Sequence, residues 1–180
     1  MATNILKIGS TAPDFNLLGI DGKKYSLASF KDKNALIVIF SCNHCPYVQA
    51  YEDRMKQIQK DYRSKGVEII AINSNEDKGY PEDSFDNMKK RAAEQNFNFP
   101  YLRDEEQSVA RAYDATHTPE IFLFDGNRKL AFHGKIDDNW QEPSKVQNHY
   151  LRNALDELLA GKEISVPETF TIGCTIKWKK

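Results

Sequence analysis

The stretch Ala35-Leu-Ile-Val-Ile-Phe-Ser-Cys-Asn-His-Cys-Pro46 joins an uninterrupted apolar run to two cysteines that are separated by two residues. The apolar, largely β-branched run at 35–40 predicts a strand that is covered on both faces of a sheet. A helix is predicted to follow from about Pro46, because apolar residues then recur every three or four positions, at Val48, Tyr51, Met55, Ile58 and Tyr62. The cysteine pair is therefore expected where a buried strand ends and a helix begins.

Strand and helix signals alternate along the rest of the chain, which predicts an α/β fold with a substantially parallel sheet. Residues 67–72 form the next apolar run and predict a second buried strand. Ser84 and Ser144 precede amphipathic stretches, and each is a candidate N-cap of a helix.

Two hairpins are predicted from turn residues. Asp21-Gly22 marks a turn in the N-terminal stretch 9–30, and Asp125-Gly126 lies between the apolar runs 121–124 and 130–133. Apolar strands around an Asp-Gly turn are typical of an antiparallel hairpin.

The composition is that of one globular domain. The chain has 180 residues, of which 40% are hydrophobic and 28% charged, so it can bury a sizeable core. We expect a single domain over 1–180, with a core at about 9–162 and a C-terminal extension at 163–180 packed on it. The formal net charge of −1 offers no basic surface to nucleic acid or to anionic lipid.

No membrane or export signal is expected. The longest apolar run is the one at 35–40, whereas a bilayer span needs about 20 residues. The first nine residues lack a charged region followed by a long apolar stretch, so we expect no signal peptide. Three cysteines, an odd and low count, do not suit a secreted disulfide scaffold, and we expect a cytoplasmic protein.

Cys42 and Cys45 are the candidate catalytic residues. A cysteine at a helix N-terminus faces free N–H groups and the positive end of the helix dipole, and both favour the thiolate. The thiolate is the nucleophile of disulfide exchange, and such positions lower its pKa from about 8.5 to between roughly 3.5 and 7.5. With Cys45 one turn inside the helix, we expect Cys42 to attack a substrate disulfide and Cys45 to resolve the mixed disulfide.

Two neighbours are candidates for tuning the pair. His44, if protonated, would favour the thiolate, although it also fits as a solvent-facing spacer. Pro46 suits the first turn of a helix, where its missing N–H costs nothing.

A metal site is a weaker hypothesis. Zinc usually takes four ligands, and beyond the pair only Cys174 and the scattered His117, His133 and His149 remain. We therefore expect no bound metal, and a metal-binding redox protein that uses the pair and a histidine is kept as a third interpretation.

Thr118-Pro119 stands before the apolar run 121–124. The proline fits simply as the first residue of a strand. It also fits a cis Thr118–Pro119 bond that faces the cysteines, and the residues alone leave both interpretations open.

The ordered set of motifs resembles the thioredoxin-fold redoxins, and more narrowly the AhpC/TSA-related, peroxiredoxin-like thioredoxin proteins. The set comprises Ala12-Pro-Asp-Phe15, the cysteine pair, Thr118-Pro119 and Gly173-Cys-Thr-Ile-Lys-Trp178, and the likeness covers about 9–178. It implies a thioredoxin-like fold, in which a central mixed sheet is flanked by helices and carries an N-terminal hairpin and a C-terminal extension.

The resemblance implies a thiol–disulfide oxidoreductase with antioxidant activity that exchanges two electrons through Cys42 and Cys45 without a bound cofactor. It assigns Thr118 and Pro119 to the turn that binds a substrate peptide much as an added strand. The implied partners are protein or small-molecule disulfides, and an external dithiol that resets the pair. Neither the physiological substrate nor the oligomeric state follows from the sequence.

A thiol peroxidase acting through Cys45, with peroxides as substrates, is the alternative. Cys45-Pro46 falls where peroxiredoxins carry their peroxide-attacking cysteine. However, Cys42 and Val38 stand where that pattern has a threonine and a proline, and no arginine matches on the strand near Pro119. Without the hydroxyl and the guanidinium, peroxide oxygens lose hydrogen bonds and positive charge.

Cys174 has two interpretations that stay open. It is either a buried small hydrophobe in the C-terminal extension, or a resolving or relay thiol that meets Cys42 or Cys45.

Acidic residues cluster after the second predicted strand, at Glu76, Asp77, Glu82 and Asp83. We expect them to lie in a solvated loop. The chain has no phosphate-binding loop and no GxGxxG motif, so no nucleotide cofactor is indicated.

Overall fold

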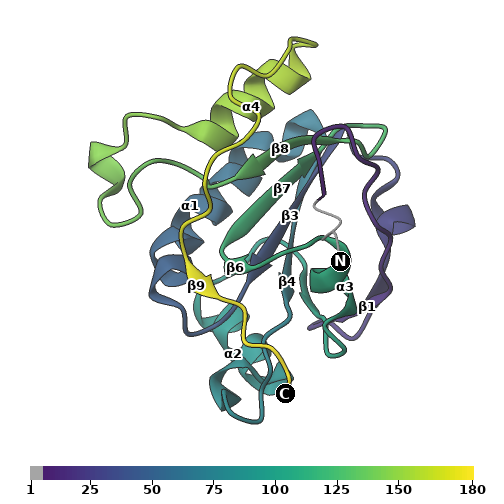
Figure 1. The fold of residues 1–180 in the computed structure, drawn as a ribbon, viewed down its shortest axis with the longest axis vertical. Coiled ribbons are helices and arrows are strands. Elements are labelled where there is room, and N and C mark those ends of the chain that lie inside the picture. Colours follow the sequence, from purple (N-terminus) through teal and green to yellow (C-terminus); the bar gives the residue numbers. More distant parts are fainter. Residues whose placement is uncertain (1–5) are drawn as a thin grey trace.

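Within residues 6–180, which the computed structural model describes, the centre of the fold is a seven-stranded mixed sheet of order β2-β1-β5-β4-β3-β7-β8 (Figure 1). A separate two-stranded sheet pairs β6 with β9. The strands are β1 (Leu17–Gly19), β2 (Lys24–Tyr25), β3 (Ala35–Ser41), β4 (Val67–Asn73), β5 (Tyr101–Arg103), β6 (His117–Thr118), β7 (Glu120–Phe124), β8 (Leu130–Gly134) and β9 (Cys174–Thr175). The first five residues, on which part of the expected absence of a signal peptide rests, lie outside the described residues.

Helices cover both faces of the sheet. The α-helices are α1 (Pro46–Tyr62), α2 (Phe85–Glu94), α3 (Ser108–Ala112) and α4 (Tyr150–Leu159), and short 3₁₀ helices lie at Leu27–Phe30, Arg63–Lys65, Pro81–Asp83 and Pro143–Lys145. One face packs against α1, α2 and α4, and the other against α3 and the N-terminal stretch 12–30. The predicted α/β fold with a mixed sheet is confirmed.

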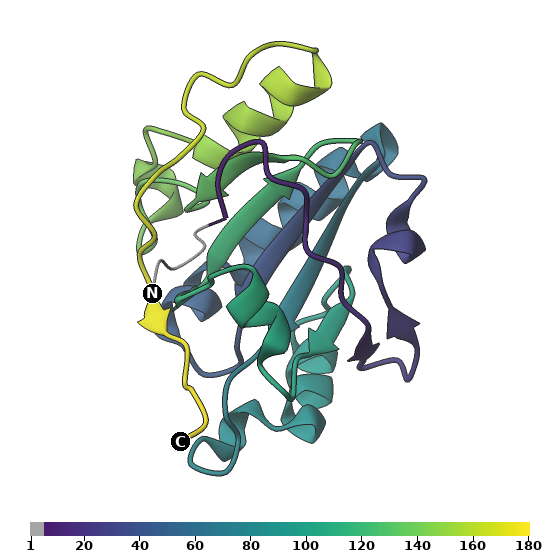
Figure 2. The same ribbon diagram turned by 45° about the vertical axis from the view of Figure 1, so that its right-hand side comes forward.

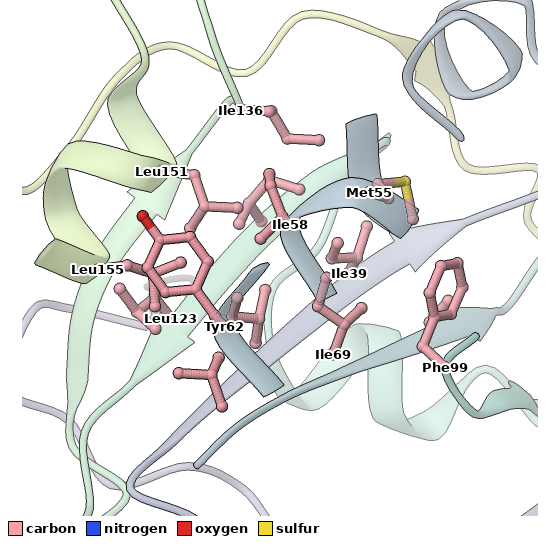
Figure 3. Close-up of a cluster of buried hydrophobic side chains, with 14 of the residues drawn as sticks. Ile39, Met55, Ile58, Tyr62, Ile69, Phe99, Leu123, Ile136, Leu151 and Leu155 are labelled. Atoms are coloured by element: carbon pink, nitrogen blue, oxygen red, sulfur yellow. The ribbon is translucent and has the colours of Figure 1, made fainter. Parts of the chain in front are cut away.

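Strand β3 is buried on both faces because its side chains alternate between two cores. Ile37 and Ile39 join the cluster beneath α1 and α4, which Figure 3 shows in close-up. Leu36, Val38 and Phe40 join the cluster on the opposite face. This alternation explains why the strand reads as one apolar run, as predicted.

The pairing of β3 brings two distant segments to one edge of the sheet. Strand β3 runs parallel to β4 and antiparallel to β7, with Phe40 opposite Glu120. The end of β3, which leads into Cys42, therefore lies beside the start of β7, which follows Pro119. Topology alone thus places the cysteine pair next to the Thr118–Pro119 turn.

Local signals gave most of the boundaries correctly. Both predicted hairpins form, with β1 antiparallel to β2 and β7 antiparallel to β8. Helix α2 begins after Ser84, whose hydroxyl accepts a hydrogen bond from the N–H of Asn87 as an N-cap should.

The last helix is an exception, because it begins at Tyr150 rather than after Ser144. The carboxylate of Asp138 accepts hydrogen bonds from the backbone N–H groups of Gln147 and Asn148. These bonds occupy donors before the helix and hold that stretch in a loop.

The C-terminal segment, residues 163–180, runs back from α4 to β9 along the body of the molecule (yellow in Figure 1 and Figure 2). Its backbone bonds to β8 through the N–H of Thr169 and the carbonyl of His133, 3.0 Å apart. Farther along, β9 pairs with β6 and so reaches the edge where the cysteines lie.

No helix in the described part of the chain combines the length and the apolar character that crossing a bilayer requires. The cytoplasmic location stays a prediction.

Candidate active site: three cysteines at the start of α1

The cysteine pair lies between the end of β3 and the start of α1. Cys42 follows β3 directly, whereas Cys45 is the N-cap of α1 and Pro46 is the first helical residue. We expected Cys45 one turn inside the helix. The free N–H groups of the first turn therefore face Cys45 rather than Cys42.

The surroundings of Cys45 stabilise its thiolate. A hydrogen bond from the Cys42 thiol lowers the pKa of Cys45 to about 4; burial opposes this shift, and further hydrogen bonds from Cys174 and from the N–H of Val48 support it. The Cys45 and Cys174 sulfurs lie 2.7 Å apart. Of the three thiols, Cys45 is therefore the one whose pKa is lowered.

Cys42 keeps its proton in this arrangement. Its hydrogen bond to Cys45, its burial and the negative charge of Asp83 all raise the pKa of the Cys42 thiol. The lowered pKa thus falls on Cys45 rather than on Cys42, where we expected it. Helix α1 begins at Pro46, as predicted, so the free N–H groups of its first turn lie at Cys45.

The Thr118–Pro119 bond is cis and faces both sulfurs. The Oγ1 of Thr118 lies 3.5 Å from the Cys42 sulfur, and the carbonyl oxygen of Thr118 lies 3.4 Å from the Cys45 sulfur. The structure therefore brings Thr118, Pro119 and the cysteine pair into one site. Of the two interpretations of Pro119, a simple strand-start residue or a cis proline facing the cysteines, it supports the second.

Cys174 completes the cluster from the opposite end of the chain. Strand β9 lies antiparallel to β6, with Cys174 directly opposite Thr118. Burial and the hydrogen bond to Cys45 raise the pKa of Cys174 to about 11, so it is a thiol at neutral pH. All three cysteines are free, and Cys174 meets Cys45 rather than packing as a remote hydrophobe.

Asp83 is a site residue that the sequence patterns did not predict. Its carboxylate is fully buried, lies 2.7 Å from Nδ1 of His44 and accepts a hydrogen bond from the backbone N–H of Asn43 at 2.7 Å. The expectation of a solvated loop was wrong for this residue. A usable signal was present in Asn73 and Asn75, two polar residues at the carboxyl end of β4, since both donate to the Asp83 carboxylate.

His44 therefore faces a carboxylate rather than open solvent. Its ring also stacks on Tyr80, with centroids 5.9 Å apart. Both contacts fix the orientation of the imidazole beside the pair, which favours the tuning interpretation over that of a spacer.

Cys42, His44 and Asp83 are the described residues whose ligand atoms could hold a metal ion, since these atoms lie within 4.8 Å of one another. A sulfur, an imidazole and a carboxylate suit zinc chemically. However, three donors, from Asn43, Asn73 and Asn75, already bond to the Asp83 oxygens. A carboxylate has about four lone-pair positions, so this network uses most of the acceptor capacity that a metal would need.

A family model described as the AhpC/TSA family matches residues 8–133. Among curated relatives, thiol-disulfide oxidoreductase ResA of Geobacillus thermodenitrificans is 31% identical over 125 residues, which are 68% of this chain and 66% of that protein. The chain thus matches just under two thirds of the length of this relative.

Solved structures extend the likeness to nearly the whole chain. An uncharacterized conserved protein from Geobacillus kaustophilus is 42% identical with a TM-score of 0.91, over 98% of this chain and 94% of that chain. A thiol:disulfide interchange protein of the thioredoxin family from Chlorobium tepidum is 24% identical with a TM-score of 0.66, over 85% of this chain and 98% of that chain. The last likeness concerns the fold alone, which is thioredoxin-like.

Proposed function

Because the chain belongs to the AhpC/TSA family, we propose that it is a thiol–disulfide oxidoreductase that exchanges two electrons through Cys42 and Cys45. The observation that carries the proposal is the position of Cys42 and of Cys45, the N-cap of α1, against the cis Thr118–Pro119 turn. Its substrates are disulfides, and an external dithiol restores the reduced pair.

The charge distribution favours Cys45 as the attacking sulfur. The Cys45 thiolate attacks one sulfur of the substrate disulfide, a mixed disulfide forms, and the other substrate sulfur leaves as a thiolate. Cys42 then gives up its proton and attacks the Cys45 sulfur. The Cys42–Cys45 disulfide forms, and the substrate leaves fully reduced. This order is the reverse of the one expected from the sequence.

Protein disulfides are the proposed substrate class. The Thr118 carbonyl lies against the Cys45 sulfur and the Thr118 hydroxyl against the Cys42 sulfur, and a polypeptide that pairs with β6 would bring its own disulfide to Cys45.

Insulin reduction in the presence of dithiothreitol tests the proposal. The wild-type protein is expected to accelerate precipitation of the reduced insulin chains, and the Cys42→Ser, Cys45→Ser double variant is expected to have no effect. Circular dichroism of both proteins controls for folding. Equal activity in the double variant would exclude the pair as the site.

A thiol peroxidase remains the second candidate, since the thiolate on Cys45 precedes Pro46 at the start of a helix. Within residues 6–180, the hydrogen-bond acceptors and donors around the Cys45 sulfur come from cysteines and backbone groups, and no arginine is among them. Hydrogen peroxide consumption on the same preparation is therefore expected to be much slower than insulin reduction. The reverse ranking would favour the peroxidase.

A further inference from the structure

Both sulfurs of the pair are covered in this structure. Cys42 is 2% exposed and Cys45 is 0% exposed, so neither can reach a disulfide on another protein. Cys174 and Tyr47 pack against the pair, and Cys174 belongs to the C-terminal segment rather than to the sheet. The residues that close the site are thus, in part, the last ones of the chain.

We propose that residues 170–176 are a built-in pseudosubstrate: β9 occupies the strand position along β6 that a substrate polypeptide would take, and Cys174 is a third exchanging thiol that bonds to Cys45. The inference rests on the proposed thiol–disulfide exchange and adds a reason why the reduced enzyme is closed.

The backbone pairing supports the first half of this inference. In the described part of the chain, strand β6 pairs with β9 and with no other strand, with His117 opposite Thr175 and Thr118 opposite Cys174. The N–H of Ile176 extends the pairing to the carbonyl of Thr116 at 2.9 Å. An edge strand with free backbone groups is a template for an added strand, so the same groups can serve either β9 or a substrate.

Gly173 is fitted to this close approach. A Cβ atom at this position would lie 2.1 Å from the carbonyl oxygen of Thr118, which is far inside van der Waals contact. Only a residue without a side chain lets the segment come this near. Because Gly173 lies so close to Thr118, the sulfur of the next residue, Cys174, contacts the sulfur of Cys45.

Two anchors flank the covering segment, and between them it is held by its backbone pairing with β6 rather than by buried apolar side chains. Thr169 is bonded to β8, and Ile176 is 3% exposed in the core. Between these points, Phe170 is 91% exposed and Ile172 is 45% exposed. Lifting residues 170–175 therefore costs little apolar burial while the two anchors stay in place.

The sulfur chemistry of the closed form balances without a further oxidant. After one turnover the pair is a Cys42–Cys45 disulfide. The Cys174 thiolate attacks the Cys45 sulfur, the Cys45–Cys174 bond forms, the Cys42–Cys45 bond breaks, and Cys42 leaves as a thiolate that takes up the proton lost by Cys174. The substrate disulfide supplied both oxidising equivalents. The exchange fastens the segment over the site until an external dithiol reduces the Cys45–Cys174 bond.

Disulfide mapping tests the covalent step. Trypsin leaves Cys42 and Cys45 on the peptide 34–54 and Cys174 on the peptide 163–177, so a Cys45–Cys174 bond links two peptides. The Cys42→Ser variant, treated with oxidised glutathione and digested without reduction, is expected to give the linked pair as its main product. The matched Cys45→Ser variant is expected to give about 10-fold less, because disulfide exchange depends on which sulfurs are in reach. Equal amounts in both variants, or glutathione adducts alone, would overturn the third-thiol role.

Alkylation of the reduced protein tests the closure. In Gly173→Ala the new methyl group displaces β9, and the rate at which iodoacetamide labels Cys45 is expected to rise about 10-fold, because reactivity follows exposure of the thiolate. The matched control is Gly79→Ala, where the nearest atom is the movable carboxylate of Glu76 at 3.1 Å. This control is expected to keep the wild-type labelling rate.

The outcomes separate this inference from the proposed function. An unchanged labelling rate in Gly173→Ala would overturn the pseudosubstrate, even where the wild-type protein reduces insulin. If neither the wild-type protein nor Gly173→Ala reduces insulin, the proposed function is overturned. In that case the disulfide map still tests the role of Cys174 as a third thiol, and the labelling rates still test whether β9 covers Cys45.

Discussion

The sulfur of Cys45 lies 2.7 Å from the sulfur of Cys174, a residue 129 positions later in the chain. The site is therefore assembled from three segments: the loop after β3, the turn before β7, and the C-terminal β9. Hydrogen bonding among the three sulfurs lowers the pKa of Cys45 and raises the pKa values of Cys42 and Cys174. Each of the three cysteines thus affects the ionisation of the others.

The first prediction concerns the order of attack. Cys45→Ser removes the thiolate, and Cys42→Ser removes the thiol that resolves the mixed disulfide. Insulin reduction is expected to fall by about 100-fold or more in each single variant, because the residues act as a unit. The variants differ in what they trap: when Cys174 is also replaced by serine, so that no second thiol can resolve the mixed disulfide, Cys42→Ser is expected to accumulate a covalent complex with a substrate peptide, visible by mass spectrometry. Accumulation in Cys45→Ser instead would restore the order expected from the sequence.

The second prediction concerns pH. The folded-state pKa of Cys45 is about 4, below the value of about 8.5 for a free cysteine. A depressed pKa contributes stability that is present above the unfolded value and is lost as pH falls through the folded value. The difference in urea-unfolding free energy between wild type and Cys45→Ser is therefore expected to shrink as pH is lowered from about 8.5 towards 4.

Ultraviolet absorbance of thiolates gives an independent measurement of the same ionisation. The reduced wild-type protein is expected to lose one thiolate as pH falls through about 4, whereas Cys45→Ser is expected to lack this step. A midpoint near the free-cysteine value would show that the N-cap does not stabilise the charge.

The fold could be predicted from local sequence patterns because each pattern is compatible with one way of burying its apolar residues. The run at 35–40 is apolar throughout since β3 lies between two cores, and the stripe from Val48 to Tyr62 is the buried face of α1. Ser84 and the Asp-Gly turns fixed element ends through short-range hydrogen bonds. Such contacts lie within a few residues of each other, so the sequence displays them directly.

The active site could be predicted only in part, because the pKa values of its cysteines depend on contacts between residues that are far apart in the sequence. The pair and the turn at Thr118 were found through their motifs. The pKa of Cys45 depends on its contacts with Cys42 and Cys174, and the buried Asp83 carboxylate depends on the amides of Asn73 and Asn75. The partner of Cys174 was left open because no spacing within residues 163–180 fixes where the segment lies.

The third prediction concerns Asp83. Asp83→Asn keeps the size of the side chain but replaces one acceptor oxygen with an N–H donor, which then faces the donors of Asn43 and Asn73 at one position or that of Asn75 at the other. The variant is expected to lose about 1–3 kcal/mol of unfolding free energy, because a buried donor is left unsatisfied. Since the Asp83 charge raises the pKa of Cys42, its removal is expected to lower that pKa.

Urea unfolding and thiolate titration measure the two effects of Asp83→Asn separately. The matched control is Glu82→Gln, a neighbouring carboxylate that is exposed and is expected to change neither quantity. An Asp83→Asn variant as stable as Glu82→Gln would mean that the buried network does not support the site.

The fourth prediction concerns Glu120, which follows the cis proline and is 2% exposed. Its Oε2 accepts hydrogen bonds from the N–H groups of Thr116 at 2.7 Å and His117 at 3.1 Å, and its Oε1 lies 2.8 Å from Nε2 of His133. The carboxylate thus fixes the backbone turn that places Thr118 against the two sulfurs. Glu120 is a positioning residue, since it does not itself touch them.

Glu120→Gln retains one acceptor oxygen and loses the other, so one side of the turn is released. The KM for insulin is expected to rise about 10-fold, since a lost hydrogen bond to a charged acceptor is worth roughly 1.5–3 kcal/mol, while kcat changes less because the sulfurs stay in place. Glu106→Gln, an exposed carboxylate on the neighbouring loop, is the matched control and is expected to keep the wild-type KM. A fall in kcat at unchanged KM would instead mean that Glu120 acts on the sulfur chemistry rather than on the strand that binds the substrate.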